Sequence, residues 1–476
     1  MISSCGISNA VFDLSMYKLF VILITFNLQS LALAQYLKSY QLDLLQIINK
    51  DKKIFSNGDL CVLPDKYKSE FYSDKDLKTE STLCSIDLEN NSAHQAVCGK
   101  IVNTNPGFDI FNFNDKIDRL MFEKQECYRH SNAENFETKK IAKLKQTITC
   151  SYTPSILAYY HVSRLLGDIG NVPVAVLRTS SKQYLLNKAN ETIKFLKTQP
   201  KSTIQLTWPT LVKSLNDNTS KRNKYLMTSD ARFAFGAIVA NPTNEEYWTD
   251  YSHDAQGDQM LRAAEFKKTG LYKMLIDSRD VASFIIREYS QENLQKIYEL
   301  ADFSDMIVID TLLKQEDRYN NIAFELDTYK AHELPVQKLS KKEQKEILSQ
   351  NPQTEFWKIK RLVLKDNDCG VASEDDIART NINIKTKISA DLAHMKESTY
   401  KALLTLAQEL NLKDRKLEVF LKENTLMTDK DFAAFKKTTL EYSKYLHDRC
   451  LSGALKLDLA PKTFFNETQS SWSCEL

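Results

Sequence analysis

Cysteine usage places the strongest constraint on how this chain can fold. Eight cysteines follow residue 34, and an even count in an exported protein predicts a set of disulfides. Neither C-x-x-C nor H-E-x-x-H occurs, so the usual spacings of redox and zinc sites are absent. The sequence does not give the pairing of the cysteines. They are Cys61, Cys84, Cys98, Cys127, Cys150, Cys369, Cys450 and Cys474.

The N-terminal segment predicts export. A lysine precedes the apolar run 19–24, and Ala32-Leu33-Ala34 then gives small residues at both positions that determine cleavage before Gln35. We therefore expect a signal peptide over residues 1–34, with Met16 as a possible start.

A membrane anchor is the alternative explanation of this segment. Its apolar run is short for a membrane span, and no later run reaches spanning length. We therefore expect no transmembrane anchor after signal cleavage. The mature protein is expected to be exported to the periplasm, to a secretory lumen or to the extracellular medium.

Length and composition are those of a large globular protein. At 476 residues the chain exceeds what one core usually spans, so two lobes or domains are expected. Hydrophobic residues make up 42% and charged residues 26%, which is enough to bury a sizeable core. The net charge of +2 gives no broad surface for nucleic acid, so no nucleic-acid partner is expected.

Two short acidic motifs follow buried-looking elements. Asp317-Arg318-Tyr319-Asn320-Asn321 comes directly after the apolar run 306–313. Asp366-Asn367-Asp368-Cys369-Gly370 comes directly after the alternating stretch 359–365. Phosphoryl transfer needs one carboxylate near the acceptor hydroxyl and another on a divalent metal, and this order of motifs is typical of kinase-type phosphotransferases. The alternative is a pair of surface turns, which Asp, Asn and Gly also favour.

A strand and a helix are predicted before these motifs. Residues 141–148 alternate between apolar and polar, so Lys143 and Lys145 are expected on the same face of a strand. A buried helix is predicted from Pro154 to Leu166. His161 in this helix is expected to be a hydrogen-bonded structural histidine.

The rest of the chain suggests an extension before this segment and helices after it. Residues 35–137 hold four cysteines and show poor helical periodicity, which predicts a disulfide-stapled N-terminal extension. The stretch between Gly99 and Gly107 resembles a phosphate-binding loop only loosely, and an ordinary loop is expected there. An inter-lobe hinge is expected near Asn241. We therefore predict an N-lobe over 138–241 and a mostly helical C-lobe over 242–476, with a solvated charged insertion at 332–348.

The motifs together resemble those of the secretory-pathway atypical kinases, the family of the Golgi casein kinase and four-jointed. Tyr160-His161-Val162-Ser163-Arg164-Leu165-Leu166-Gly167, followed by Asn171-Val172-Pro173-Val174, is similar to that family's helix and Val-Pro strand. The two acidic motifs follow in the family's order, and the resemblance covers about 138–375. It implies an α+β, two-lobed, protein-kinase-like fold with a small mixed N-lobe and a mostly helical C-lobe.

The resemblance also implies a reaction. ATP would donate its γ-phosphate to a hydroxyl of a protein or glycan acceptor. Asp317 would orient or deprotonate that hydroxyl, and Arg318 would brace the catalytic loop.

Roles for the nucleotide and metal follow in the same way. Asp366 would hold Mn²⁺ or Mg²⁺ against the phosphates, and Lys145, with Lys143 as the alternative, would contact them from its strand. Asn321 or Asn320 is a possible second metal ligand, although related loops place that group five residues after the Asp, where this chain has Ile322. Asp368 replaces a common glycine of the metal turn and is a possible further carboxylate.

One departure from the family concerns the helix. Kinases of this kind carry an acid there, but Pro154 to Leu166 contains neither Asp nor Glu, and the corresponding position falls near Ser155 or Ile156. The alternatives to an active kinase are therefore a pseudokinase that binds nucleotide or a partner without turnover, and a non-enzymatic disulfide-rich scaffold. For an active kinase we expect a substitute acid near the lysine or metal, chosen from Glu134, Glu137, Asp168 and Asp368.

Overall fold

The structure is a computed structural model. It describes residues 51–89, 94–101, 105–113, 119–125, 127–128, 138–200, 202–217, 225–241, 245–252, 257–373, 377–466 and 473–475. The expected signal peptide over 1–34 and the acids Glu134 and Glu137 lie outside these residues.

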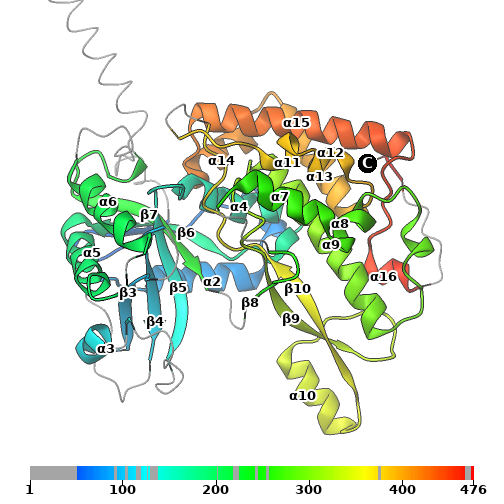
Figure 1. The fold of residues 1–476 in the computed structure, drawn as a ribbon, viewed down its shortest axis with the longest axis horizontal. Helices are drawn as coiled ribbons and strands as arrows, with labels where there is room; N and C mark the ends of the chain where they lie inside the picture. Colours follow the sequence, from blue (N-terminus) through cyan, green and yellow to red (C-terminus); the bar gives the residue numbers. More distant parts are fainter. Residues whose placement is uncertain are drawn as a thin grey trace, which may run out of the picture.

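A seven-stranded antiparallel sheet forms one side of the molecule (Figure 1). β5, which carries Lys143 and Lys145, is an interior strand between β7 and β4. The strands, in their order across the sheet, are β1 (Lys52–Ile54), β2 (Leu60–Val62), β6 (Ala175–Ser181), β7 (Phe233–Ala240), β5 (Lys139–Gln146), β4 (Gly107–Asn112) and β3 (Gln95–Gly99).

Helices pack on this sheet, and one of them is completely buried. Every residue of α4 (Thr153–Leu165) is buried, as its largely apolar sequence requires, and Pro154 occupies its first turn. His161 lies inside it and shares a 2.8 Å hydrogen bond with the Tyr72 hydroxyl, as expected for a structural histidine. The other helices here are α2 (Asp74–Ser85), α3 (Arg119–Gln125), α5 (Lys182–Leu196) and α6 (Ile204–Asn216).

A second, three-stranded sheet connects to the first after residue 240. The chain leaves β7 at Ala240 and enters the second sheet at Glu246, beside the expected hinge. Its hairpin projects from the molecule and carries α10 (Lys341–Gln350), which has no buried residue, in agreement with a solvated insertion (Figure 1). The strands are β10 (Phe356–Val363), β9 (Ala323–Lys330) and β8 (Glu246–Tyr247).

The remainder of the chain is helical and surrounds one long helix. α9 (Gln291–Leu312) is buried continuously from Leu300 onward and directs its end toward the first acidic motif. No helix in the described part of the chain is long and apolar enough to span a membrane. The other helices are α7 (Gln259–Lys268), α8 (Gly270–Leu275), α11 (Ile382–Lys385), α12 (Ile388–Asp391), α13 (Glu397–Asn411), α14 (Lys416–Thr425), α15 (Asp429–Leu451) and α16 (Pro461–Phe464), with short 3-10 turns at Ser69–Phe71, Ile169–Asn171 and Val281–Ser283.

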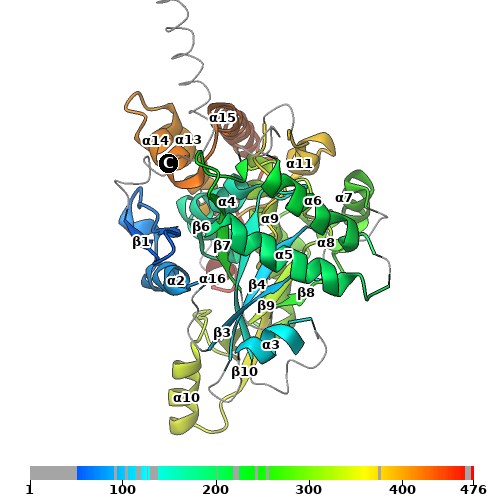
Figure 2. The same ribbon diagram turned by 90° about the vertical axis from the view of Figure 1, so that its left-hand side faces the viewer.

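This arrangement confirms the predicted two-lobed α+β architecture, with a sheet-based N-lobe and a mostly helical C-lobe (Figure 1). In Figure 2 the sheet part, with α5 and α6, faces the viewer. The stretch predicted as an N-terminal extension, 35–137, contributes β1 to β4 to the same sheet as the predicted N-lobe. α14 of the helical part packs against α4 of the sheet part. The domain limits at 137 and 241 stay predictions.

All eight cysteines after residue 34 are paired, as their even number predicts. Two disulfides lie within the sheet part, and one ties the C-terminal segment to α15. The fourth joins residues 219 positions apart and connects the segment after β5 with the second acidic motif. The pairs are Cys61–Cys84, Cys98–Cys127, Cys150–Cys369 and Cys450–Cys474.

These pairs predict that the folded protein carries no reactive thiol among the eight cysteines. Alkylation without reduction should leave them unmodified, because a disulfide sulfur is not a thiolate. Mass spectrometry of a non-reduced digest should recover a peptide pair linking Cys150 to Cys369. Alkylation of either residue in freshly purified protein would contradict the pairing.

Candidate phosphotransfer site

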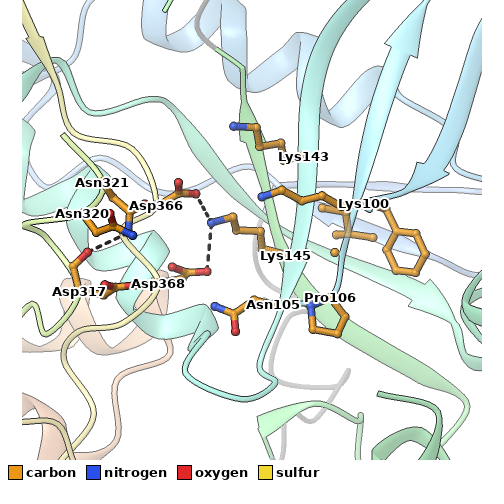
Figure 3. A pocket seen from close by; sticks show the side chains of 13 residues that line it. Lys100, Asn105, Pro106, Lys143, Lys145, Asp317, Asn320, Asn321, Asp366 and Asp368 are labelled. Atoms are coloured by element: carbon orange, nitrogen blue, oxygen red, sulfur yellow. Dashed lines mark hydrogen bonds and ion pairs between the residues drawn. The ribbon is translucent and has the colours of Figure 1, made fainter. Parts of the chain in front are cut away.

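The second acidic motif and β5 meet at one buried ion cluster. The Lys145 amine lies 2.7 Å from Asp366 Oδ1 and 3.0 Å from Asp368 Oδ2 (Figure 3). Burial disfavours the charged amine, but the two carboxylates outweigh this effect and raise the pKa of Lys145 above its usual value. Burial likewise disfavours the Asp366 carboxylate, yet Lys145 and other lysines hold the pKa of Asp366 well below its usual value.

A cavity of about 170 Å³ lies beside this cluster. Lysines from the sheet line one side of it and acids and amides from the two motifs line the other (Figure 3). Of the residues expected in the site, the structure brings Lys143, Lys145, Asp317, Asn320, Asn321, Asp366 and Asp368 to this cavity.

The turn that carries Asp366 is held by the start of α4. Ser155 Oγ donates to the Asn367 carbonyl at 2.7 Å and accepts from the Gly370 N–H at 3.1 Å. Asp366 itself has φ of 54°, in the left-handed region that Asp tolerates better than most residues. Ser155 is near the position where the sequence resemblance implies an acid. In this chain that position anchors the turn after β10 through a hydroxyl.

Among the described residues, Asp368 is the candidate acid that reaches Lys145. Of the four residues considered from the sequence, Asp168 lies elsewhere, paired with Arg164 at 2.8 Å. Glu134 and Glu137 are outside the described residues. The second carboxylate on Lys145 therefore comes from the turn after β10, two residues after Asp366.

Asp317 faces the cavity from the loop after α9. Its Oδ1 accepts hydrogen bonds of 2.8 Å from both Gln259 Nε2 and Arg262 Nη1. Burial raises the pKa of Asp317 above its usual value, and Gln259 and Arg262 oppose this shift. Asn321 donates from Nδ2 to the Asp317 carbonyl at 2.9 Å, which leaves its side-chain oxygen for another partner.

Arg318 lies behind the cavity and joins the two motifs. Its guanidinium pairs with Asp310 at 2.8 Å, donates to Asn367 Oδ1 at 2.6 Å and reaches the Lys365 carbonyl at 2.8 Å. It is 1% exposed. Although burial disfavours its charge, Asp310 raises the pKa of Arg318 above its usual value. Arg318 is thus placed to brace the loop and does not line the cavity.

Lys143 lines the cavity but takes a different partner. Its amine lies 3.7 Å from Glu245, which also pairs with Lys365 at 3.0 Å. Of the two lysines considered from the sequence, Lys145 is therefore the one that contacts Asp366.

The connection between β3 and β4 is a part of the site that the sequence did not identify. The stretch between Gly99 and Gly107, expected to be an ordinary loop, contributes Lys100 and Asn105 to the cavity. Its ends are joined by a 2.9 Å hydrogen bond from Lys100 N–H to the Gly107 carbonyl. A lysine beside a glycine in a short inter-strand connection was the signal available, and it is a weak one.

Lys100 is a buried cation without a paired anion in the described part of the chain. Its side chain points into the cavity near Lys143 and Lys145, and the residue is 8% exposed (Figure 3). Burial lowers the pKa of Lys100 to about 8, and the two lysines add to this effect while Asp366 opposes it. Such a group favours an anionic ligand.

A different cluster of metal-binding residue types also lies near the site. Cys150, Asp317 and Cys369 are the one such group found among the described residues. The two sulfurs are joined in a disulfide, so they are not the thiolates that bind metals. The oxygen donors of Asp366, Asp368 and Asn321 are instead the type that Mg²⁺ and Mn²⁺ prefer.

Comparisons with known proteins give matches of fold at low sequence identity. No family model matches the chain, and no curated protein matches it. A structure of the Golgi casein kinase with Mn and ADP bound matches with a TM-score of 0.40 and 13% identity, covering 80% of each chain. Another structure of the Golgi casein kinase matches with a TM-score of 0.38 and 12% identity, covering 84% of this chain and 78% of the other. The sequence motifs resemble those of the family that includes this kinase.

The packing around the turn after β10 predicts a strict requirement for glycine at position 370. A Cβ on Gly370 would lie 2.7 Å from the Leu313 carbonyl and 2.9 Å from Ser155 Oγ. We expect Gly370→Ala to lower the free energy of unfolding by about 1–3 kcal/mol. Gly270→Ala is the matched control, because a Cβ there meets nothing within 4 Å. Chemical denaturation of both variants tests this, and equal stabilities would contradict the described packing.

Proposed function

We propose that this chain is an exported kinase-like phosphotransferase that moves the γ-phosphate of ATP to a hydroxyl of a protein or glycan. The observation that carries the proposal is the meeting of Lys145, Asp366 and Asp317 at one cavity. These side chains come from three distant segments, and phosphoryl transfer needs a cation, a metal-binding carboxylate and an acceptor-side carboxylate together. The four disulfides support export.

The sheet side of the cavity is suited to the phosphates. Lys145 offers its amine beside Asp366, and Lys100 brings a second cation that has no paired carboxylate among the described residues. An amine that is buried without an anion is stabilised when a phosphate binds, because the phosphate supplies the missing negative charge. Lys143 pairs with Glu245, so it would contribute less directly to phosphate binding.

The opposite side is suited to a divalent cation. Asp366 and Asp368, with Asn321 on the same side of the cavity (Figure 3), would hold Mn²⁺ or Mg²⁺ through oxygen atoms. A bound cation neutralises charge on the phosphates and orients them for in-line transfer. Asp368 thus has two roles, since it also contacts Lys145 in place of the acid missing from α4.

Asp317 would act on the acceptor. Its carboxylate faces the cavity and receives the proton of the acceptor hydroxyl. The hydroxyl oxygen forms a bond to the γ-phosphorus as the bond from that phosphorus to the β–γ bridging oxygen breaks, which releases the nucleoside diphosphate. Arg318 keeps this loop in place by pairing with Asp310 and contacting Asn367 of the metal turn.

A pseudokinase is the second candidate function, and one contact favours it. Lys145 engages both carboxylates of the metal turn, so a metal must compete with the lysine for Asp366 and Asp368. If Lys145 keeps both carboxylates, the protein would bind a nucleotide or a partner without transferring phosphate. Measurement of phosphate transfer with Mn²⁺ and ATP, using casein as a hydroxyl-bearing acceptor, separates the two functions.

The proposed roles predict different losses from two conservative substitutions. Asp366→Asn should abolish Mn²⁺-dependent nucleotide binding, because the metal loses its main carboxylate. Asp317→Asn should leave that binding intact and lower transfer by about 10²–10⁴-fold, the usual contribution of a positioned base. Calorimetric titration with ADP and Mn²⁺ measures nucleotide binding by both variants, and transfer assays measure their activity. Equal loss of binding in both folded variants would contradict the assignment.

Lys100 predicts a pH dependence of nucleotide affinity. Its pKa of about 8 means that its positive charge is lost as the pH rises through that value, so ADP affinity should fall there. Lys100→Met should weaken binding by about tenfold at neutral pH and reduce this fall. Lys139→Met, at the exposed start of β5, is the control and should behave as the unaltered protein. An unchanged affinity for Lys100→Met would exclude a phosphate contact.

A further inference from the structure

Two side chains of α7 hold the same oxygen of Asp317. Gln259 Nε2 and Arg262 Nη1 each lie 2.8 Å from Asp317 Oδ1. They are three residues apart, so they project from the same face of the helix. Asp258 fixes the start of this helix by accepting hydrogen bonds from two backbone N–H groups of the first turn. The sequence offered no motif for this pair.

The helix is fixed against the loop that carries Asp317. The ring of Phe266 lies 4.8 Å from that of Tyr319, two residues after Asp317, and 5.8 Å from Phe303 of α9. Tyr319 is anchored in turn by a 2.6 Å hydrogen bond to Asn383. The donors Gln259 and Arg262 thus lie on a fixed helix, and the acceptor Asp317 lies on an anchored loop. This arrangement fixes the orientation of the Asp317 carboxylate.

Charge gives Arg262 a second effect on Asp317. Asp366 and Asp368 both act unfavourably on the Asp317 carboxylate, whereas Arg262 acts favourably. Arg262 is 6% exposed, so its interaction is weakly screened by water. Without this arginine, the carboxylates of Asp317, Asp366 and Asp368 would face one another around the cavity. Lys145 pairs only with the last two of them.

We infer that Gln259 and Arg262 are positioning residues that hold Asp317 Oδ1 and thereby present Oδ2 to the acceptor hydroxyl. The inference rests on the proposed phosphotransferase function. In the transfer step, the proton of the acceptor hydroxyl passes to Oδ2, which receives no hydrogen bond from the described residues. The oxygen of that hydroxyl replaces the β–γ bridging oxygen on the γ-phosphorus.

Four variants of the full chain test the inference. Arg262→Met removes the ion pair, Arg262→Lys keeps the charge without the planar guanidinium, and Gln259→Leu removes the second donor. Lys268→Met is the matched control, because it removes a cation from the solvent side of the same helix, where Lys268 is 70% exposed and pairs with Glu265. Transfer to casein and hydrolysis of ATP without acceptor are measured, together with ADP binding in the presence of Mn²⁺.

A positioning role predicts loss in kcat alone. Arg262→Met should lower kcat by about 10²-fold, as expected when a reacting group is misplaced, with KM for ATP and the Kd for ADP changed less than about twofold. Gln259→Leu should lose less, and Arg262→Lys should recover part of the loss. Lys268→Met should match the unaltered protein.

Other outcomes overturn the inference. An unchanged or increased kcat in Arg262→Met, or an effect confined to KM, would exclude the positioning role while leaving the phosphotransferase function in place. An equal loss in Lys268→Met would attribute the effect to the helix as a whole. Absence of both transfer and hydrolysis in the unaltered protein would refute the proposed function and, with it, the role of this pair.

Discussion

The arrangement of the site depends on a buried amine shared by two carboxylates. Lys145 lies on an interior strand of the sheet, and Asp366 and Asp368 lie in the turn after β10. The buried amine and the buried carboxylates stabilise one another, because removal from water costs several kcal/mol for each ion. The contact therefore forces the sheet and the turn into one relative position, and the cavity forms where they meet.

A second buried pair sets the position of the loop that carries Asp317. Arg318 and Asp310 are both almost inaccessible to water, and Tyr159 of α4 donates to the same Asp310 at 2.6 Å. Because Arg318 also contacts Asn367, the loop after α9 and the turn after β10 share one hydrogen-bonded frame. The chain thus uses α4, which lacks an acid, for structural support through Ser155 and Tyr159.

Sequence reasoning identified the parts of the site that have a local signal. Asp317 and Asp366 each follow directly after a buried element, and alternation placed Lys143 and Lys145 on one face, although it did not decide between them. The two-lobed fold was implied by the resemblance of the ordered motifs to those of the secretory-pathway kinases. Asp368 was one of four acids considered, and only packing selects it. Lys100 and Arg262 were missed because their places depend on strand register and helix packing, which leave no motif near either residue.

The disulfide between Cys150 and Cys369 limits how the cavity can open. It joins the segment after β5 to the turn that carries Asp366, with a Cα separation of 5.3 Å. Any movement that separates the sheet from the helical part must keep these two points together. The sheet part therefore cannot slide along the helical part at this point. The cavity can widen only by rotation of the two parts about this covalent link.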